Sequence, residues 1–141
     1  MPNTPSLYRA VYFSTAAPHL SPAEVHGLAT NASRANWREG VTGSLIFTGG
    51  HFAQWLEGAR EQVQALLHRI DADPRHSAMK VVHDGLAERR QFGQWGMRYV
   101  YNLDLDDLLD TAHRLENGPA LQDALRRIFL DTQLDDLNPS I

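Results

Sequence analysis

The stretch VTGSLIFTGGHFAQWLEG, residues 41–58, contains two strand-like runs joined by a pair of glycines. The runs, residues 41–48 and 51–57, are rich in apolar and β-branched side chains. Gly49-Gly50 between them is a two-residue turn signal. The pattern therefore predicts a tight β-hairpin.

A helical pattern flanks the hairpin on each side. Ser21-Pro22-Ala23-Glu24 matches a capping box with proline at the first helical position, and this helix should end within residues 35–40. After the hairpin, apolar residues recur at helical spacing until Asp73-Pro74, which should stop a second helix. The apolar stripe of this second helix consists of Val63, Leu66, Leu67 and Ile70.

Three further segments, residues 7–14, 79–86 and 96–101, have the apolar patterns of strands. The predicted order is βαββαβ followed by one more strand. Two helices crossing one face of a mixed sheet make a ferredoxin-like α+β sandwich the leading fold class.

The pattern changes after residue 102, where apolar residues recur at helical spacing on both sides of Gly118-Pro119. This predicts a helical hairpin whose core is too small to stand alone, so we expect it to cap the other face of the sheet. The chain then divides into a domain over residues 1–101 and a cap or output extension over residues 102–141.

Composition excludes several functional classes. The chain has no cysteine, which rules out disulfides, thiolate metal sites and cysteine nucleophiles. Its seven histidines have none of the spacings typical of metal motifs, so we expect no metal site. The net charge of −4 argues against binding to nucleic acid.

Hydropathy gives an expectation for the location. No apolar run approaches the roughly 18 residues that a membrane span needs. Residues 1–5 lack the basic and apolar regions of a secretory signal. We therefore expect a cytoplasmic protein without a membrane segment.

A few polar residues interrupt the apolar patterns. Burying the amide of Gln54 costs about 1–3 kcal/mol unless its donors and acceptor are paired. Tyr12 could supply a partner, because it would lie on the same helix-covered face as Gln54 if the strands that carry the two residues are neighbours. Asn36 lies at the end of the first helix, and Arg69 and Asp73 have i, i+4 spacing. These residues fit a polar rim around a flat ligand, or else an edge strand with a solvated glutamine and a surface salt bridge.

Several motifs, in order and in register, resemble the BLUF family, the sensors of blue light using FAD. The similarity begins with the strand LYRAVYFS and runs from about residue 7 to residue 101. The further matching motifs are Asn36 with residues 40–43, residues 52–58, residues 69–70 with 73–76, and residues 89–97.

The resemblance implies a chromophore and a switch. The cofactor would be FAD. FMN and riboflavin are alternatives, because the family's site contacts the ring more than the phosphate tail. Tyr12 would donate an electron to the photoexcited flavin, and Gln54 would bridge the tyrosine hydroxyl and the ring and change its orientation or tautomer after light. The absence of cysteine excludes flavin photochemistry through a cysteine adduct.

The resemblance also assigns the rest of the site. Asn36 would hydrogen-bond the polar edge of the ring, with Arg69 and Asp73 supporting that edge. Leu28 and Ile70, one from each helix, would sandwich the ring.

Two residues at the start of the last predicted strand, Trp95 just before it and Met97 within it, would relay the change outward. The sequence leaves open which of them lies next to the flavin. Trp55 is expected to be a packing residue. Between Trp95 and Met97, Gly96 stands where the family usually has serine.

The function implied by the resemblance is a blue-light photoreceptor that catalyses no turnover reaction. Output would pass to an unknown partner protein or through a homo-oligomer, because no familiar output domain fits after residue 102. A small hydrolase of the acylphosphatase type, using Arg69, Asn36 and a histidine, is the alternative. A second alternative is an RNA-binding module of the same topology, although the net negative charge of the chain argues against RNA binding.

Overall fold

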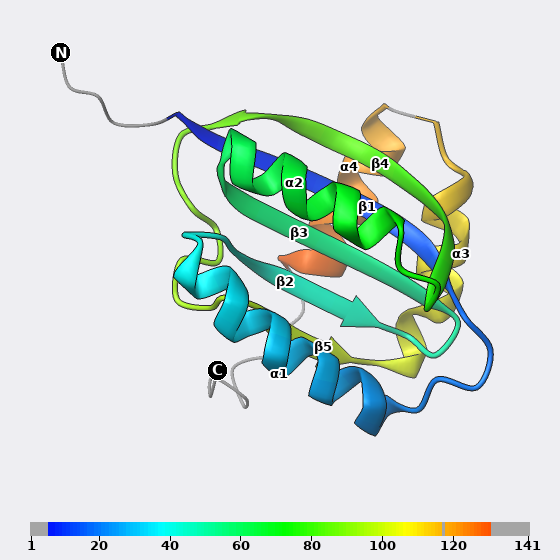
Figure 1. The fold of residues 1–141 in the computed structure, drawn as a ribbon. Helices are drawn as coiled ribbons and strands as arrows, with labels where there is room; N and C mark the ends of the chain where they lie inside the picture. Colours follow the sequence, from blue (N-terminus) through cyan, green and yellow to red (C-terminus); the bar gives the residue numbers. More distant parts are fainter. Residues whose placement is uncertain (1–5, 117, 131–141) are drawn as a thin grey trace, which may run out of the picture.

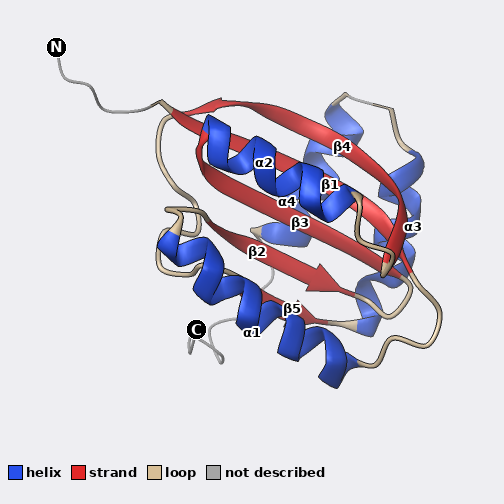
Figure 2. Cartoon of the chain, viewed as in Figure 1, coloured by secondary structure: helices blue, strands red, loops and turns tan. Residues whose placement is uncertain are grey.

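The computed structural model describes residues 6–116 and 118–130. The described residues form five strands and four α-helices, arranged as Figures 1 and 2 show. In chain order the elements are β1 (Leu7–Ala16), α1 (Pro22–Arg38), β2 (Thr42–Phe47), β3 (His51–Ala59), α2 (Arg60–Asp71), β4 (His76–Ala87), β5 (Arg98–Tyr101), the 3-10 turn η1 (Leu103–Leu105), α3 (Asp106–Arg114) and α4 (Pro119–Phe129).

The sheet is mixed and has the strand order β4-β1-β3-β2-β5. β1 pairs antiparallel with both β3 and β4, β2 pairs antiparallel with β3, and β2 pairs parallel with β5. The predicted hairpin is confirmed, and Gly49 at its turn has a φ of 99°, a conformation that glycine adopts without strain. The predicted ferredoxin-like α+β class is confirmed as well.

The predicted start of α1 and the predicted ends of α1 and α2 are also confirmed. The Ser21 side chain accepts from the Glu24 backbone N–H, and the Glu24 side chain accepts from the Ser21 backbone N–H, which is the predicted capping box. α1 ends at Arg38 and α2 ends at Asp71, two residues before Asp73-Pro74. Asp73 therefore lies beyond the helix that carries Arg69.

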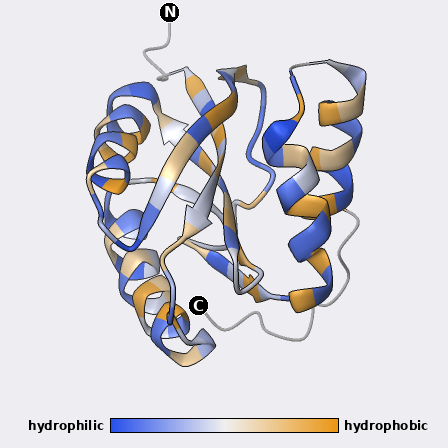
Figure 3. Cartoon of the chain, turned by 90° about the vertical axis from the view of Figure 1, so that its right-hand side faces the viewer, coloured by the Kyte–Doolittle hydropathy of each residue, from blue (hydrophilic) through white to orange (hydrophobic). Residues whose placement is uncertain are grey.

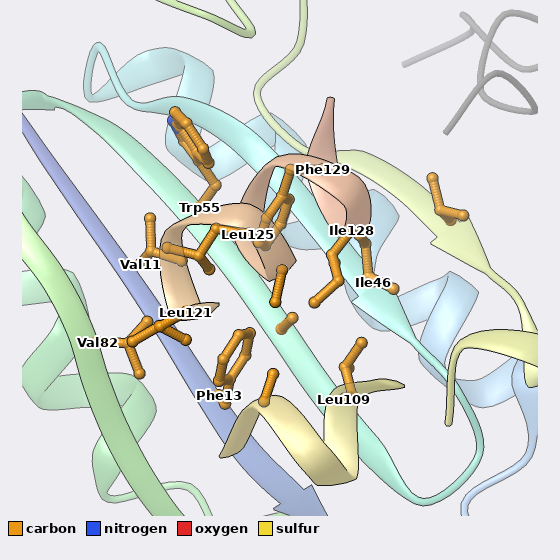
Figure 4. Close-up of a cluster of buried hydrophobic side chains, with 14 of the residues drawn as sticks. Val11, Phe13, Ile46, Trp55, Val82, Leu109, Leu121, Leu125, Ile128 and Phe129 are labelled. Carbon is orange, nitrogen blue, oxygen red and sulfur yellow. The ribbon is translucent and has the colours of Figure 1, made fainter. Parts of the chain in front are cut away.

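Two cores lie on the two faces of the sheet (Figures 1 and 3). α1 and α2 cover one face, where Tyr8, Ala10 and Leu56 are buried. The C-terminal helices α3 and α4 cover the other face, as predicted. Figure 4 shows the apolar cluster that they form with the sheet, which includes Val11, Phe13, Ile46, Trp55, Val82, Leu109, Leu121, Leu125, Ile128 and Phe129.

The last strand starts later than the sequence pattern indicated. β5 begins at Arg98, so Trp95 and Met97 lie in the segment before it rather than within the strand. The backbone carbonyls of this segment form hydrogen bonds with α1 and with the start of β2. The Gly96 carbonyl accepts from Asn36 Nδ2 at 3.2 Å, and the Trp95 carbonyl accepts from the Gly43 N–H at 3.2 Å. β4, at His76–Ala87, is longer than predicted.

In the described part of the chain, no helix is both long and apolar enough to cross a membrane. The same residues contain no group of three or more histidine, aspartate or glutamate side chains arranged to hold a metal ion.

Candidate flavin site

A pocket lies between α1 and α2, and its floor is the helix-covered face of the sheet. It has an empty volume of about 750 Å³, which includes space open to solvent. Its lining residues are mostly apolar with polar groups at the floor and rim: Tyr12, Val25, Leu28, Ala29, Ala32, Asn36, Leu45, Phe52, Gln54, Leu66, Ile70, Asp73, Arg75, His76 and Met97.

Tyr12 and Gln54 meet at the floor of this pocket. β1 and β3 place them directly opposite one another in the antiparallel ladder. Both side chains are buried, and the Tyr12 hydroxyl donates a hydrogen bond to Gln54 Oε1. Burial, with a smaller contribution from the negative charge of Asp73, raises the pKa of Tyr12 well above its usual range. Tyr12 therefore stays a protonated donor at physiological pH.

The other end of the Gln54 amide faces the segment before β5. Gln54 Nε2 lies 3.4 Å from the sulfur of Met97, which is fully buried. Trp95 does not line the pocket; it packs against the core on the α3–α4 face. Of the two residues that the sequence left open, the structure brings Met97 to the site.

Trp55 lies on the opposite face of β3 from Gln54. Its ring packs edge-on against Phe92 and Phe129, with centroids 5.4 and 5.5 Å away. The interpretation of Trp55 as a packing residue is confirmed.

Three more of the expected site residues line the pocket. Leu28 on α1 and Ile70 on α2 contribute apolar surface from its two helical walls. Asn36, in the last turn of α1, is buried and donates from Nδ2 to the Gly96 carbonyl. This bond ties the end of α1 to the segment that carries Met97.

The structure separates Arg69 from Asp73. The Arg69 side chain is 60% exposed, lies 3.4 Å from Glu39 and does not line the pocket. Asp73 does line it and pairs with Arg75, whose Nη2 and Nε lie 2.7 and 2.9 Å from the carboxylate oxygens. The hydrogen bond from Arg75 holds the pKa of Asp73 below its usual range.

Sequence reasoning assigned no role to Arg75 or His76, although both belong to one of the matching motifs. His76 Nε2 is 2.6 Å from the Ile70 carbonyl, and Nδ1 is 2.7 Å from Ser14 Oγ. A carbonyl only accepts, so Nε2 carries a proton, and in the neutral ring Nδ1 accepts from the serine. The imidazole therefore fixes the end of α2 to β1, with its ring centroid 6.0 Å from that of Tyr12.

The chain is similar in sequence to known proteins whose names refer to light. The chain is 38% identical over 89 residues to the blue light- and temperature-regulated antirepressor BluF of Escherichia coli K12, a match that covers 61% of this chain and 22% of that protein. It is 31% identical over 137 residues to photoactivated adenylate cyclase subunit beta of Euglena gracilis, covering 96% of this chain and 15% of the relative. The chain thus spans less than a quarter of either relative's length.

A solved structure extends the similarity to the whole fold. The dark-state structure of BlrB, a BLUF protein, superposes with a TM-score of 0.70 at 33% identity, covering 87% of this chain and 94% of that one. The family model described as sensors of blue light using FAD matches residues 7–98, a span that contains every residue lining the pocket. The chain therefore belongs to the BLUF family.

Proposed function

We propose that this chain is a blue-light photoreceptor that binds a flavin between α1 and α2 and signals through Tyr12 and Gln54. The observation that carries the proposal is the contact series Tyr12–Gln54–Met97 at the floor of the pocket. It joins a phenol, a reversible amide and a side chain just before β5, the three groups that a hydrogen-bond switch requires.

The pocket suits a flat ring system with one polar edge. Leu28 and Ile70 offer apolar contact from its two walls, and Asn36, Asp73 and Arg75 supply donors and acceptors. FAD is the expected form because the family uses it, and FMN or riboflavin would fit the same ring-binding residues. Bound flavin would supply absorption of blue light and an electron acceptor.

The chain's own residues would carry out the switching. Tyr12 can give up an electron and a proton together, and its hydroxyl already donates to Gln54 Oε1. Gln54 presents donor and acceptor atoms in one plane, so turning the amide over exchanges what its neighbours receive. Met97, in contact with Nε2, would be the first residue on the output side to sense the change.

Output would leave through protein contacts rather than through a reaction. We propose residues 1–101 as the flavin-binding unit and residues 102–141 as the output extension, of which residues 131–141 lie outside the described part. The signal would pass to a partner protein or to another copy of this chain in a homo-oligomer. The names of the relatives connect light with an antirepressor and with an adenylate cyclase. We propose that this chain acts in the cytoplasm and likewise controls a partner.

An absorption spectrum of the purified protein, in darkness and then under blue light, tests the proposal. Flavin bands that move slightly to the red and return in darkness are the expected result. Bands that bleach would mean that flavin binds but that the roles of Tyr12 and Gln54 are wrong. A protein that stays colourless after incubation with FAD, FMN or riboflavin would refute the sensor function and favour the hydrolase alternative.

A further inference from the structure

A carboxylate lies fully buried on the face of the sheet opposite the pocket. Glu57 is 0% exposed and follows Gln54 by three residues on β3. Its Oε1 accepts from Thr42 Oγ1 at 3.0 Å and from the Phe92 N–H at 2.6 Å. Its Oε2 accepts from Trp55 Nε1 at 3.1 Å and from the Gln91 N–H at 2.8 Å. Four donors thus converge on one side chain, far more than a surface glutamate collects.

Two of these donors belong to the segment that leads to Met97. The Gln91 and Phe92 amides bind the carboxylate, and the Phe92 ring is buried against Trp55 with an edge-on geometry. The Trp95 N–H then donates to the Phe92 carbonyl at 3.1 Å. Glu57 therefore fixes the start of residues 91–97 on the α4 side of the sheet.

The end of the same segment is held on the flavin side. The Trp95 carbonyl accepts from Gly43, and the Gly96 carbonyl accepts from Asn36. The next residue, Met97, contacts Gln54 Nε2. Residues 91–97 thus cross the sheet edge from the Glu57 cluster to the switch, and the position of Met97 depends on anchors at both ends.

We propose that Glu57 is a positioning residue that acts through Met97 to set the lifetime of the light state, an inference that rests on the proposed function. With residues 91–97 anchored, Met97 confines the Gln54 amide, and the amide must pass this side chain to return to its dark orientation. Loosening the anchor lets Met97 move aside and speeds the return. Glu57 itself does not line the pocket, so flavin binding and the initial light reaction do not require it.

The variant Glu57→Gln tests this without changing the shape of the side chain. An amide nitrogen donates and does not accept, so in either orientation the glutamine leaves one backbone N–H, of Gln91 or of Phe92, without its acceptor. The purified protein with bound flavin should keep its dark spectrum and its red shift. Its dark recovery should become about tenfold faster, which is about 1.4 kcal/mol in the barrier.

Thr48→Val is the matched control. It removes the hydrogen bond from Thr48 Oγ1 to Asp106 at 2.6 Å and the acceptor of the His51 N–H at 3.1 Å, but at the hairpin turn away from residues 91–97. We expect its recovery to stay within about twofold of the wild type, a spread that general destabilisation accounts for. Equal acceleration in Thr48→Val and Glu57→Gln would overturn the proposal, because recovery would then follow stability rather than position.

A double-mutant cycle with Met97→Ala separates a specific route from a general one. If Glu57 acts through Met97, Glu57→Gln should change the recovery rate of a Met97→Ala protein by less than about twofold. A full tenfold effect in that background would refute the route through Met97. Should Glu57→Gln fail to fold, Trp55→Phe removes the indole donor to Glu57 and, with it, part of the ring that packs against Phe92 and Phe129. It should accelerate recovery by about fivefold, the equivalent of about one hydrogen bond, and an unchanged rate there would overturn the proposal.

The outcomes also separate this inference from the proposed function. A wild-type protein with no red shift contradicts both. A normal red shift in every variant, with recovery in Glu57→Gln within about twofold of the wild type, leaves the photoreceptor function intact and overturns the role of Glu57 alone.

Discussion

Replacing Tyr12 with phenylalanine removes a single hydroxyl from the floor of the pocket. The ring stays, and with it the apolar contact between β1 and the pocket. Among the described residues, that hydroxyl forms its hydrogen bond with Gln54 Oε1. The perturbation is therefore confined to one hydrogen bond at the proposed switch.

The size of its effect on stability follows from burial. Gln54 is 6% exposed, so its carbonyl oxygen loses a partner in a place that water reaches poorly. Leaving a buried acceptor unpaired costs about 1–3 kcal/mol of unfolding free energy. Tyr8→Phe is the matched control on the same strand and face: its hydroxyl donates to Asp84 at 2.6 Å, but Asp84 is exposed and regains water, so we expect a loss of about 0.5–1.5 kcal/mol.

The two variants should differ most in their response to light. Urea unfolding of the flavin-free proteins gives the free energies, and absorption spectra before and after blue light give the photochemistry. We expect both variants to bind flavin, Tyr8→Phe to keep the full red shift, and Tyr12→Phe to lose it. A full and reversible shift in Tyr12→Phe would refute the assignment of Tyr12 as the group that responds to excited flavin.

Three further predictions concern the surroundings of the site. Among the described residues the Tyr99 hydroxyl is buried without a hydrogen-bond partner, and burial, helped by Tyr101, raises its pKa from 10.0 to about 12. The stability linked to this raised pKa is complete below pH 10 and is lost as the pH rises toward 12, so the unfolding free energy of Tyr99→Phe, measured with urea, should fall less steeply than that of the wild type across that window. Near pH 7 the unfolding free energy of Tyr99→Phe should equal that of the wild type or exceed it by about 1 kcal/mol. A loss of stability at pH 7 would contradict this. A Cβ at Gly96 would lie 2.1 Å from the Ser33 carbonyl oxygen, so Gly96→Ala should lower the unfolding free energy by about 1–3 kcal/mol, and an unchanged melting temperature would show that α1 yields freely. Truncation after Asn102 removes α3 and α4 from the core that they share with the sheet, so the fragment should aggregate or lose cooperative unfolding in size-exclusion chromatography and circular dichroism, whereas a soluble fragment that unfolds cooperatively would show that residues 1–101 fold alone.

Features of the fold that depend on neighbouring residues could be predicted from the sequence. The glycine pair at the hairpin turn and the capping box of α1 act over two to three residues, and both occur where expected. The alternation along β1 and β3 placed Tyr12 and Gln54 on one face. Their direct pairing additionally required the strands to be neighbours in this register, which the family resemblance supported and the hydrogen-bonded ladder shows.

Features that depend on distant partners could not be predicted. Glu57 is a charge near the end of a strand in the sequence, and its backbone donors lie 34 and 35 residues away. The partner of Asp73 depended on where α2 ends: the i, i+4 spacing suggested Arg69, but the helix stops at Asp71, and the turn after it brings Arg75 to the carboxylate. Periodicity predicts which residues share a face of a helix or strand. It predicts neither contacts between residues distant in the sequence, as for Glu57, nor the residue at which a helix ends, as for Asp73.

The unequal contacts of Gln54 explain how a glutamine at this position can act as a switch. Its Oε1 accepts from a buried hydroxyl, whereas Nε2 faces only a thioether sulfur at 3.4 Å, a weak acceptor. Turning the amide over would place Nε2 against the Tyr12 oxygen, which can also accept, but it would turn Oε1 toward the thioether, which has no proton to donate. Without a ligand the turned orientation would therefore leave a buried acceptor unpaired, at a cost of about 1–3 kcal/mol. A hydrogen bond from a polar atom of a bound ring could offset a cost of this size, and because Met97 contacts the amide, we expect a change of orientation to reach residues 91–97 without any larger movement of the sheet.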